Sequence, residues 1–484
     1  MKRLFFSTAF ILVVTSIFIS LLGVGCAVIV PPGGGPKDTL PPVLVKAVPN
    51  DTSTHFNTNK IVLTFDEYVQ LDNNLNDNLI VSPIPNTMPF VESKLHNVTV
   101  RLKDSLEANT TYSINFGKAI KDVNEGLPYK DFTYVFSTGS HIDQNTFSGT
   151  VTLAETGKVD STLIVILHSN LSDTAVEKVK PRYFAKLDGK GHFTFRFLPP
   201  GKFNAFVLPN DYTKKYDDST KLFAFLNAPV NISDTASAES VQFYAYQQAK
   251  EKPKPATTST SNNGTSENKS KKEKDKEKQE DKRLKIAPGA ADQGLLEDYE
   301  FSFNRKLKIF DSTAILLTDT NYKAISNYKV SLDTGRTKVR IKYTWPENTE
   351  YKLIITKSAA TDSADIALTK NDTLAFSTKS ESDYGSIRLR FNDVDLSKNP
   401  VLLMMKGEDI YQVIPLATRE WYQKLYEPGD YEMRILYDDN KNGVWDPGNY
   451  KEKKQPEIVE AVKRKLNIKA NWDNEVEIVL RSSQ

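Results

Sequence analysis

The sequence predicts an all-β protein made of tandem small β-sandwiches, in which a two-module unit occurs twice. Three observations support this fold class. Short runs of β-branched and aromatic residues recur along the chain, clusters of Asn, Asp, Gly and Pro separate them, and patterns of the first half return in the second. Long helical periodicity is absent, and the one helix that we expect is short, at residues 457–464.

The first half carries the clearest strand patterns. Each run is short, combines β-branched with aromatic residues, and is bounded by residues that favour turns. This spacing is typical of a β-sandwich. The runs are residues 61–65, 98–102, 112–116 and 132–136.

Three pairs of matching segments indicate a duplication. Tyr112 and Tyr351 lie in similar segments 239 residues apart (351 − 112), and the Phe-Ser-Thr that begins at Phe136 returns 240 residues later (376 − 136). A Pro-Gly turn followed by an apolar strand occurs at 198–208 and again at 426–436. Because the matches keep the same order, we expect two copies of a two-module unit.

A stretch without aromatic residues separates the two copies. Between Tyr246 and Tyr299 the chain lacks the apolar side chains that would offset the entropy of ordering, so we predict a disordered, charged linker. We name the four modules A1, B1, A2 and B2. The predicted organisation is a signal peptide at 1–25, a Pro/Gly tether at 26–42, A1 at 43–140, B1 at 145–246, the linker at 247–296, A2 at 297–380 and B2 at 384–482.

The N-terminus has the pattern of a lipoprotein signal. Lys2 and Arg3 precede an apolar run that ends in Gly-Val-Gly and then in Cys26, the single cysteine of the chain. We expect Cys26 to be acylated and to become the mature N-terminus. The alternative is a transmembrane anchor, since the run approaches the roughly 20 residues that span a bilayer. Ala27, rather than Asp, follows Cys26 and favours the outer membrane.

The composition argues against several functional classes. The formal net charge is +2, and loss of Lys2 and Arg3 would leave a neutral chain, so no nucleic-acid partner is expected. A single cysteine cannot form a disulfide within the chain. No serine-hydrolase, zinc-protease or nucleotide-binding motif is present, so we expect no enzymatic activity.

One loop resembles a calcium site. The side chains of Asp438, Asn440, Asn442 and Asp446, with the carbonyl of Val444, follow the spacing of a calcium loop around Gly443. The twelfth position holds Asn449 instead of the usual glutamate. The sequence therefore predicts one Ca²⁺, and the alternative is a metal-free turn rich in Asn, Asp and Gly. Residues 210–216 occupy the matching place in B1 and contain two lysines, so no ion is expected there.

Four tryptophans allow a second functional hypothesis. Exposed aromatic rings bind sugars, which would make the protein a lectin-like surface module. The favoured interpretation is that each tryptophan covers a small core. The four are Trp345, Trp421, Trp445 and Trp472.

Short motifs add a family resemblance. The A modules resemble the bacterial Ig-like domain of surface-layer proteins, through Pro41-Pro-Val, the strand 61–66, residues 109–112 and the Phe136-Ser-Thr end. The B modules resemble the transthyretin-like sandwiches related to carboxypeptidase regulatory domains, through the Pro-Gly turn at 198–203. With its Pro-Gly-rich tether, the whole chain is similar to Ig-like-domain lipoproteins of Bacteroidota-type outer membranes.

This resemblance implies a non-catalytic envelope protein. We expect an accessory or scaffold subunit, anchored to the outer membrane by its lipid and docked on an integral outer-membrane protein or complex. The cell-surface face is favoured over the periplasmic face. The alternatives are a glycan-binding or adhesion module and a structural component of a surface layer.

Overall fold

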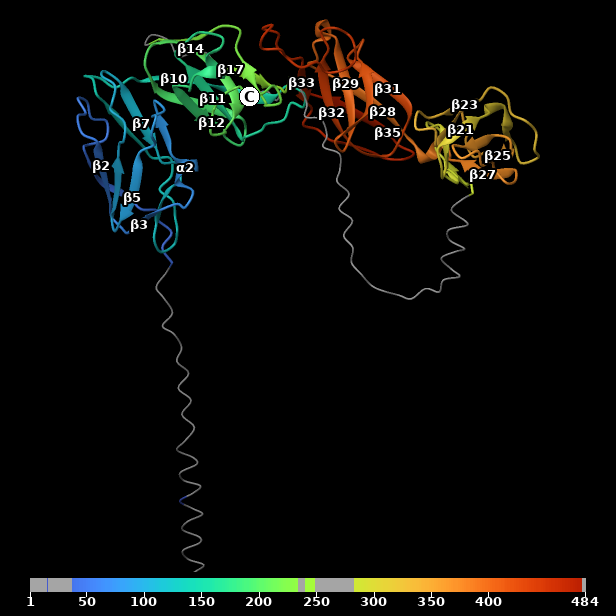
Figure 1. Cartoon of the computed structure of the whole chain (residues 1–484), viewed down its shortest axis with the longest axis horizontal. Helices are drawn as coiled ribbons and strands as arrows, with labels where there is room; N and C mark the ends of the chain where they lie inside the picture. Colours follow the sequence, from blue (N-terminus) through green and yellow to red (C-terminus); the bar gives the residue numbers. More distant parts are fainter. Residues whose placement is uncertain (1–14, 16–36, 234–239, 249–282, 481–484) are drawn as a thin grey trace, which may run out of the picture. The chain divides into compact units, whose positions relative to one another are not determined.

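The computed structural model describes residue 15 and residues 37–233, 240–248 and 283–480. The predicted signal peptide, Cys26, and most of the predicted tether and linker lie outside these residues. The chain divides into two compact units, residues 1–144 with 197–199, and residues 145–196 with 200–484, which are described separately. Almost every element is a strand, which confirms the predicted all-β fold class (Figure 1).

The first unit contains A1, drawn in blue in Figure 1. A four-stranded sheet, β1-β2-β6-β5, and a three-stranded sheet, β4-β7-β9, enclose its core, and β3 pairs with β8. Leu63, Val98, Phe116 and Phe136 are fully buried in one hydrophobic cluster. The elements are β1 Leu44–Val48, β2 Lys60–Phe65, β3 Val69–Leu71, α2 Leu75–Asn78, β4 Ile80–Ser82, β5 Phe90–Lys94, β6 Asn97–Arg101, β7 Thr111–Asn115, β8 Ile120–Asp122 and β9 Thr133–Ser137.

A2 lies in the second unit and repeats this topology. Its sheets are β18-β20-β24-β23 and β19-β27-β25-β22, and β21 pairs with β26. Leu317, Val339 and Leu353 are among its fully buried core residues. The elements are β18 Ile286–Ala287, β19 Asp292–Gln293, β20 Tyr299–Phe303, β21 Leu307–Phe310, η1 Ser312–Ala314, β22 Ile315–Thr318, β23 Lys329–Leu332, β24 Lys338–Lys342, β25 Glu350–Ile355, β26 Ala360–Asp362, β27 Asp372–Thr378 and η2 Glu381–Asp383.

Individual hydrogen bonds also recur between A1 and A2. The Thr138 hydroxyl accepts from Thr110 N at 3.0 Å and donates to Glu107 O at 2.7 Å. The Thr378 hydroxyl accepts from Thr349 N at 2.9 Å and donates to Pro346 O at 2.6 Å. The same pair of threonine hydrogen bonds therefore occurs at the C-terminal end of both modules.

B1 is a two-sheet sandwich. One sheet has the order β13-β10-β17, with β10 and β17 parallel, and the other has the order β12-β11-β14-β15, with β16 also paired to β14. All six residues of β11 are buried, so this strand forms the centre of the core. The elements are β10 Asn145–Leu153, β11 Leu163–His168, α3 Ala175–Lys178, β12 Tyr183–Lys186, β13 His192–Leu198, β14 Gly201–Pro209, β15 Ala224–Phe225, β16 Val230–Ile232 and β17 Val241–Ala245.

B2 has the same strand order as B1. Its sheets are β31-β28-β35, with β28 and β35 parallel, and β30-β29-β32-β33, with β34 also paired to β32. The predicted Pro-Gly turns open equivalent strands: Gly201 starts β14 at φ 152° and Gly429 starts β32 at φ 149°, a backbone conformation that favours glycine. The elements are β28 Gly385–Phe391, η3 Leu396–Lys398, β29 Pro400–Lys406, β30 Asp409–Pro415, β31 Glu420–Tyr426, β32 Gly429–Tyr437, β33 Ile458–Ala461, β34 Leu466–Ile468 and β35 Asp473–Ile478.

Two sequence predictions about the fold are wrong. The helix expected at 457–464 is instead strand β33, because the open edge of β32 offers hydrogen bonds to Ile458–Ala461. The predicted linker extends too far at its C-terminal end, since Leu284 is buried in the A2 core and β18 and β19 lie before residue 297. Within the described part of the chain, no helix has the length and apolarity to cross a bilayer.

Candidate functional site

The loop between β32 and β33, residues 438–457, carries all five predicted calcium ligands. Asp438 is 1% exposed, and its carboxylate accepts from Asn442 N at 3.2 Å and Gly443 N at 2.7 Å. Gly443 has φ 75°, which lets the backbone curl around this carboxylate. The loop is thus closed by its own first residue.

Asp446 accepts hydrogen bonds from side-chain amides of the same loop. The side-chain amides of Asn440 and Asn442 both donate to its Oδ2, the latter at 3.1 Å. The Val444 amide donates to Asn442 Oδ1 at 2.6 Å, while the Val444 side chain is exposed. The structure therefore brings the predicted residues together in one turn, held by hydrogen bonds among themselves.

Glu457 is a member of this site that the sequence pattern did not identify. It is 4% exposed, and its carboxylate accepts from Asp439 N at 2.9 Å and Asp446 N at 3.0 Å. Burial raises the pKa of Glu457, and the charges of Asp438 and Asp446 raise it further, whereas the two backbone bonds lower it. Asn449, at the usual glutamate position, instead pairs with Lys454 at the base of a small turn. No residue spacing in the sequence signals that this turn returns the chain to Glu457.

The charges of this loop differ from those of its B1 counterpart. In B1, the Lys221 ammonium lies 2.5 Å from Asp211 and 2.6 Å from Asp217. Among the described residues, no lysine or arginine forms an ion pair with Asp438, Asp446 or Glu457. Within those residues, no three His, Cys, Asp or Glu side chains are grouped closely enough to bind a metal by themselves.

The second half of the loop joins B2 to B1. Tyr450 is 4% exposed and belongs to the hydrophobic cluster of B1. Its ring meets Phe206, Phe223 and Phe225 edge-on, with centroids 5.8, 5.2 and 5.1 Å away. Its hydroxyl donates to Asp173 O at 2.8 Å. The two modules therefore share a core. We call Tyr450 and the B1 residues that it contacts, Phe206, Phe223, Phe225 and Asp173, the Tyr450 clamp.

Polar contacts surround the Tyr450 clamp. The Lys453 ammonium lies 2.6 Å from Asp173 and 4.1 Å from the centre of the Tyr450 ring. The Gln455 amide donates to Phe225 O at 3.1 Å, and Val459 N donates to Ala154 O at 2.8 Å. These bonds satisfy backbone groups at the junction that would otherwise lose their water contacts.

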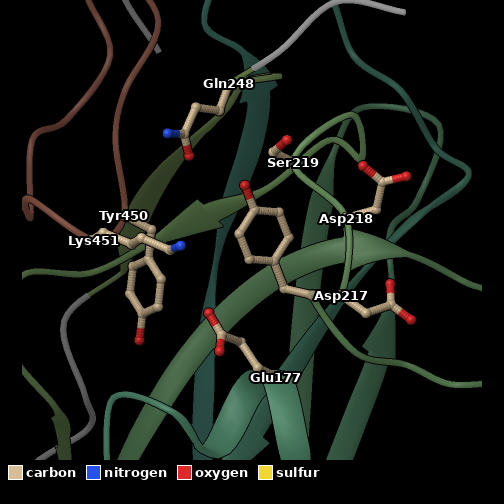
Figure 2. A pocket seen from close by; sticks show the side chains of 8 residues that line it. Glu177, Asp217, Asp218, Ser219, Gln248, Tyr450 and Lys451 are labelled. Atoms are coloured by element: carbon tan, nitrogen blue, oxygen red, sulfur yellow. The ribbon is translucent and has the colours of Figure 1, made fainter.

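A hollow of about 420 Å³ lies beside the clamp. Figure 2 shows Glu177 and Lys451 on one side of it and Asp217 and Asp218 on the other. Tyr216, Ser219, Gln248 and Tyr450 complete the lining. Its groups are carboxylates, hydroxyls, an amide and one ammonium.

The four tryptophans have different environments. Trp345 is 5% exposed and donates to Glu297 O at 3.0 Å, and Trp445 is half-buried and donates to Glu457 O at 2.8 Å. Trp421 packs against the B2 core. The interpretation that each tryptophan covers a core fails for Trp472, which is 63% exposed.

An apolar patch borders strand β30, at the open edge of its sheet. Ile410 is 55% exposed and pairs with the buried Met405 of β29, and Val413 is 42% exposed and pairs with the buried Leu403. Residues opposite one another on neighbouring strands share a face. Gly443, the chain neighbour of the exposed Val444, lies beside Val413: a Cβ added to it would be 4.0 Å from Val413 Cγ1. We call Ile410, Val413 and Val444 the β30 patch.

Comparison with known proteins identifies one domain. A family model for the bacterial Ig-like domain matches residues 38–138, which contain every strand of A1. No curated protein matches the chain.

Several solved structures show a low similarity to this chain. The major pilin subunit BcpA of Bacillus cereus is 11% identical, with a TM-score of 0.16, over 70% of this chain and 100% of the pilin. The TIE protein of Bacillus anthracis is 12% identical, with a TM-score of 0.16, over 94% of this chain and 76% of that one. The surface-layer protein SbsC is 10% identical, with a TM-score of 0.16, over 90% of this chain and 54% of that one.

Proposed function

We propose that the chain is a non-catalytic accessory or scaffold subunit of an envelope protein complex. The observation that carries this proposal is the β30 patch. Single exposed apolar residues are common on protein surfaces. Strand β30 pairs on one side only among the described strands, so its other side exposes backbone hydrogen-bonding groups together with the apolar side chains of Ile410 and Val413. A partner strand can pair with such an edge while its side chains cover the apolar margin.

The Tyr450 clamp supports the same role. A shared core fixes B1 against B2, so a partner that docks on B2 meets a platform of two modules that is already ordered. Binding to a pre-ordered surface avoids the entropy loss of fixing two flexible modules. This arrangement favours a docking platform over a set of independent domains.

The partner that we propose is an integral outer-membrane protein. The lipoprotein pattern at Cys26 supports anchoring to the outer membrane, on its cell-surface face, as in the Bacteroidota-type lipoproteins that the sequence resembles. Confinement to a membrane raises the effective concentration of the β30 patch toward membrane partners.

Affinity purification from detergent-solubilised membranes tests this function. The full chain should recover an integral outer-membrane protein in stoichiometric amount, and the Ile410→Lys/Val413→Lys double variant should lose it. Ile309→Lys is the matched control, because Ile309 is 54% exposed on β21 of A2 and lies outside the patch. Recovery of the chain alone, or equal recovery with the double variant, would contradict the proposal.

We also propose that the loop at 438–457 binds one Ca²⁺. The ligands would be the carboxylates of Asp438 and Asp446, the amide oxygens of Asn440 and Asn442, and the Val444 carbonyl. The uncompensated negative charge of Asp438, Asp446 and the buried Glu457 supports a cation here, because its B1 counterpart holds a lysine ammonium instead. Rotation of the two asparagine amides would turn oxygen, in place of nitrogen, toward the ion.

A further inference from the structure

Trp472 is held in a fixed turn although its side chain faces water. Its carbonyl accepts from Ser386 N at 2.9 Å and from the Asn474 side chain at 3.0 Å. The preceding amide, Asn471 N, donates to Tyr384 O at 2.8 Å. The Trp472 side chain is 63% exposed, and the Lys469 ammonium lies 5.1 Å from the centre of its ring.

A second exposed aromatic lies in the same depression. Tyr422 of β31 is 49% exposed, and the Arg388 guanidinium lies 4.7 Å from the centre of its ring. Tyr422 and Trp472 together line a hollow of about 340 Å³. We call this hollow the Trp472 groove.

The rest of the groove is polar. Asp473 accepts from the Ser386 hydroxyl at 2.5 Å, and Glu381 pairs with Lys424 at 2.7 Å. Each of these carboxylates has further lone pairs that can accept from a ligand. The remaining lining residues are Ser382, Tyr384, Leu425 and Asn471.

We propose that the Trp472 groove binds a neutral glycan. A pyranose ring has an apolar C–H face that stacks on an aromatic ring, and hydroxyls at its edge that need donors and acceptors. The groove supplies two aromatic surfaces and, beside them, carboxylates, hydroxyls, an amide and an ammonium. The carboxylates of Asp473 and Glu381 disfavour polyanionic sugars.

A proline-rich peptide fits the groove less well. Such peptides dock in aromatic grooves through apolar ridges and offer few hydrogen bonds. Leu425 is the one aliphatic residue in the lining, so most of the groove would remain without suitable contacts. The glycan site goes beyond the scaffold role and involves none of the residues of the β30 patch.

Binding of the full chain to immobilised oligosaccharides tests this inference. The probes are neutral oligosaccharides of glucose, galactose, mannose and N-acetylglucosamine, with proline-rich peptides on the same array. We expect at least one oligosaccharide to bind, and Trp472→Ala to weaken it roughly tenfold or more, as for a central aromatic contact. Binding should also change the fluorescence of the wild-type chain and leave that of Trp472→Ala unaffected.

Tyr212→Ala is the matched control, because Tyr212 is a fully exposed aromatic residue outside the groove. It should bind the oligosaccharide as the wild type does, and all variants should keep the wild-type unfolding midpoint. The inference is overturned if no oligosaccharide binds, if Trp472→Ala binds equally well, or if only the peptides bind in a Trp472-dependent way.

Discussion

The hydroxyl of Tyr450 in B2 donates a hydrogen bond of 2.8 Å to the carbonyl of Asp173 in B1, across 277 residues of sequence. The hydroxyl that donates this hydrogen bond belongs to a ring that also packs against three phenylalanines of B1. Tyr450 therefore contributes, together with the other contacts of the junction, to coupling the stability of the two modules.

Truncation of Tyr450 should uncouple B1 from B2. We expect Tyr450→Ala to lower the free energy of unfolding by about 3–5 kcal/mol, the range for removing a large aromatic from a core. Tyr450→Phe, which keeps the ring and loses the bond to Asp173, should lower it by only about 1 kcal/mol. Denaturant unfolding followed by fluorescence measures both values, and equal losses in the two variants would disagree with a packing role for the ring.

Gly157 offers an independent test of the same junction. It has φ 65°, and a Cβ added there would lie 2.6 Å from Ala461 N and 2.7 Å from Val459 O of B2. Gly157→Ala should therefore separate the modules and lower the calorimetric unfolding temperature. Gly189→Ala, where an added Cβ meets no atom within 4 Å, is the control and should leave that temperature nearly unchanged.

His168 should make B1 sensitive to mild acid. It is 2% exposed, and burial lowers the pKa of its imidazole from 6.5 to about 4. A lowered pKa means that the unfolded chain binds a proton between these values while the folded chain does not. The stabilisation is therefore complete above pH 6.5 and is lost as the pH falls toward 4, by about 1.4 kcal/mol per pH unit and roughly 3 kcal/mol in total.

Comparison of two histidine variants isolates this effect. His168→Leu should flatten the dependence of unfolding free energy on pH between 6.5 and 4. His141→Gln, at a side chain that is 73% exposed, should retain the wild-type slope. A wild-type slope in His168→Leu would assign the acid sensitivity to other groups.

The calcium proposal predicts a gain in stability on adding the ion. One Ca²⁺ at a hundred times its dissociation constant should stabilise the folded chain by about 2.7 kcal/mol. Isothermal calorimetry should show one site in the wild type and none in Asp438→Asn. Asp211→Asn in B1 is the matched control and should bind as the wild type does; absence of heat in the wild-type titration counts against the site.

The strands could be predicted because strand and turn preferences depend mainly on residues that are close together in the sequence. The run of β-branched and aromatic residues at 61–65 becomes β2, with Ile61, Leu63 and Phe65 buried, and the Pro-Gly turn at Gly201 opens β14 as expected. The same local information misjudged residues 457–464, since β33 forms only because β32 offers it a partner.

The contacts that matter most for the site are not local. Glu457 lies 19 residues beyond Asp438 (457 − 438), and the residue spacing of a calcium loop does not extend that far. Tyr450 has an ordinary sequence context, and its role depends on aromatic residues of a module that precedes the predicted linker. Sequence reasoning identified the turn at 438–446 and could not identify what the rest of the loop contacts.

The parallel pairing of terminal strands has a mechanical consequence. In B1 the first strand, β10, runs beside the last, β17, from Gly149 opposite Val241 to Leu153 opposite Ala245; in B2, β28 runs beside β35 from Ser386 opposite Asp473 to Phe391 opposite Ile478. The chain therefore enters and leaves each module at opposite ends of a ladder. A pulling force on the two ends loads these hydrogen bonds in shear, so that they must break together, and tension is resisted by the whole ladder instead of being relieved one bond at a time.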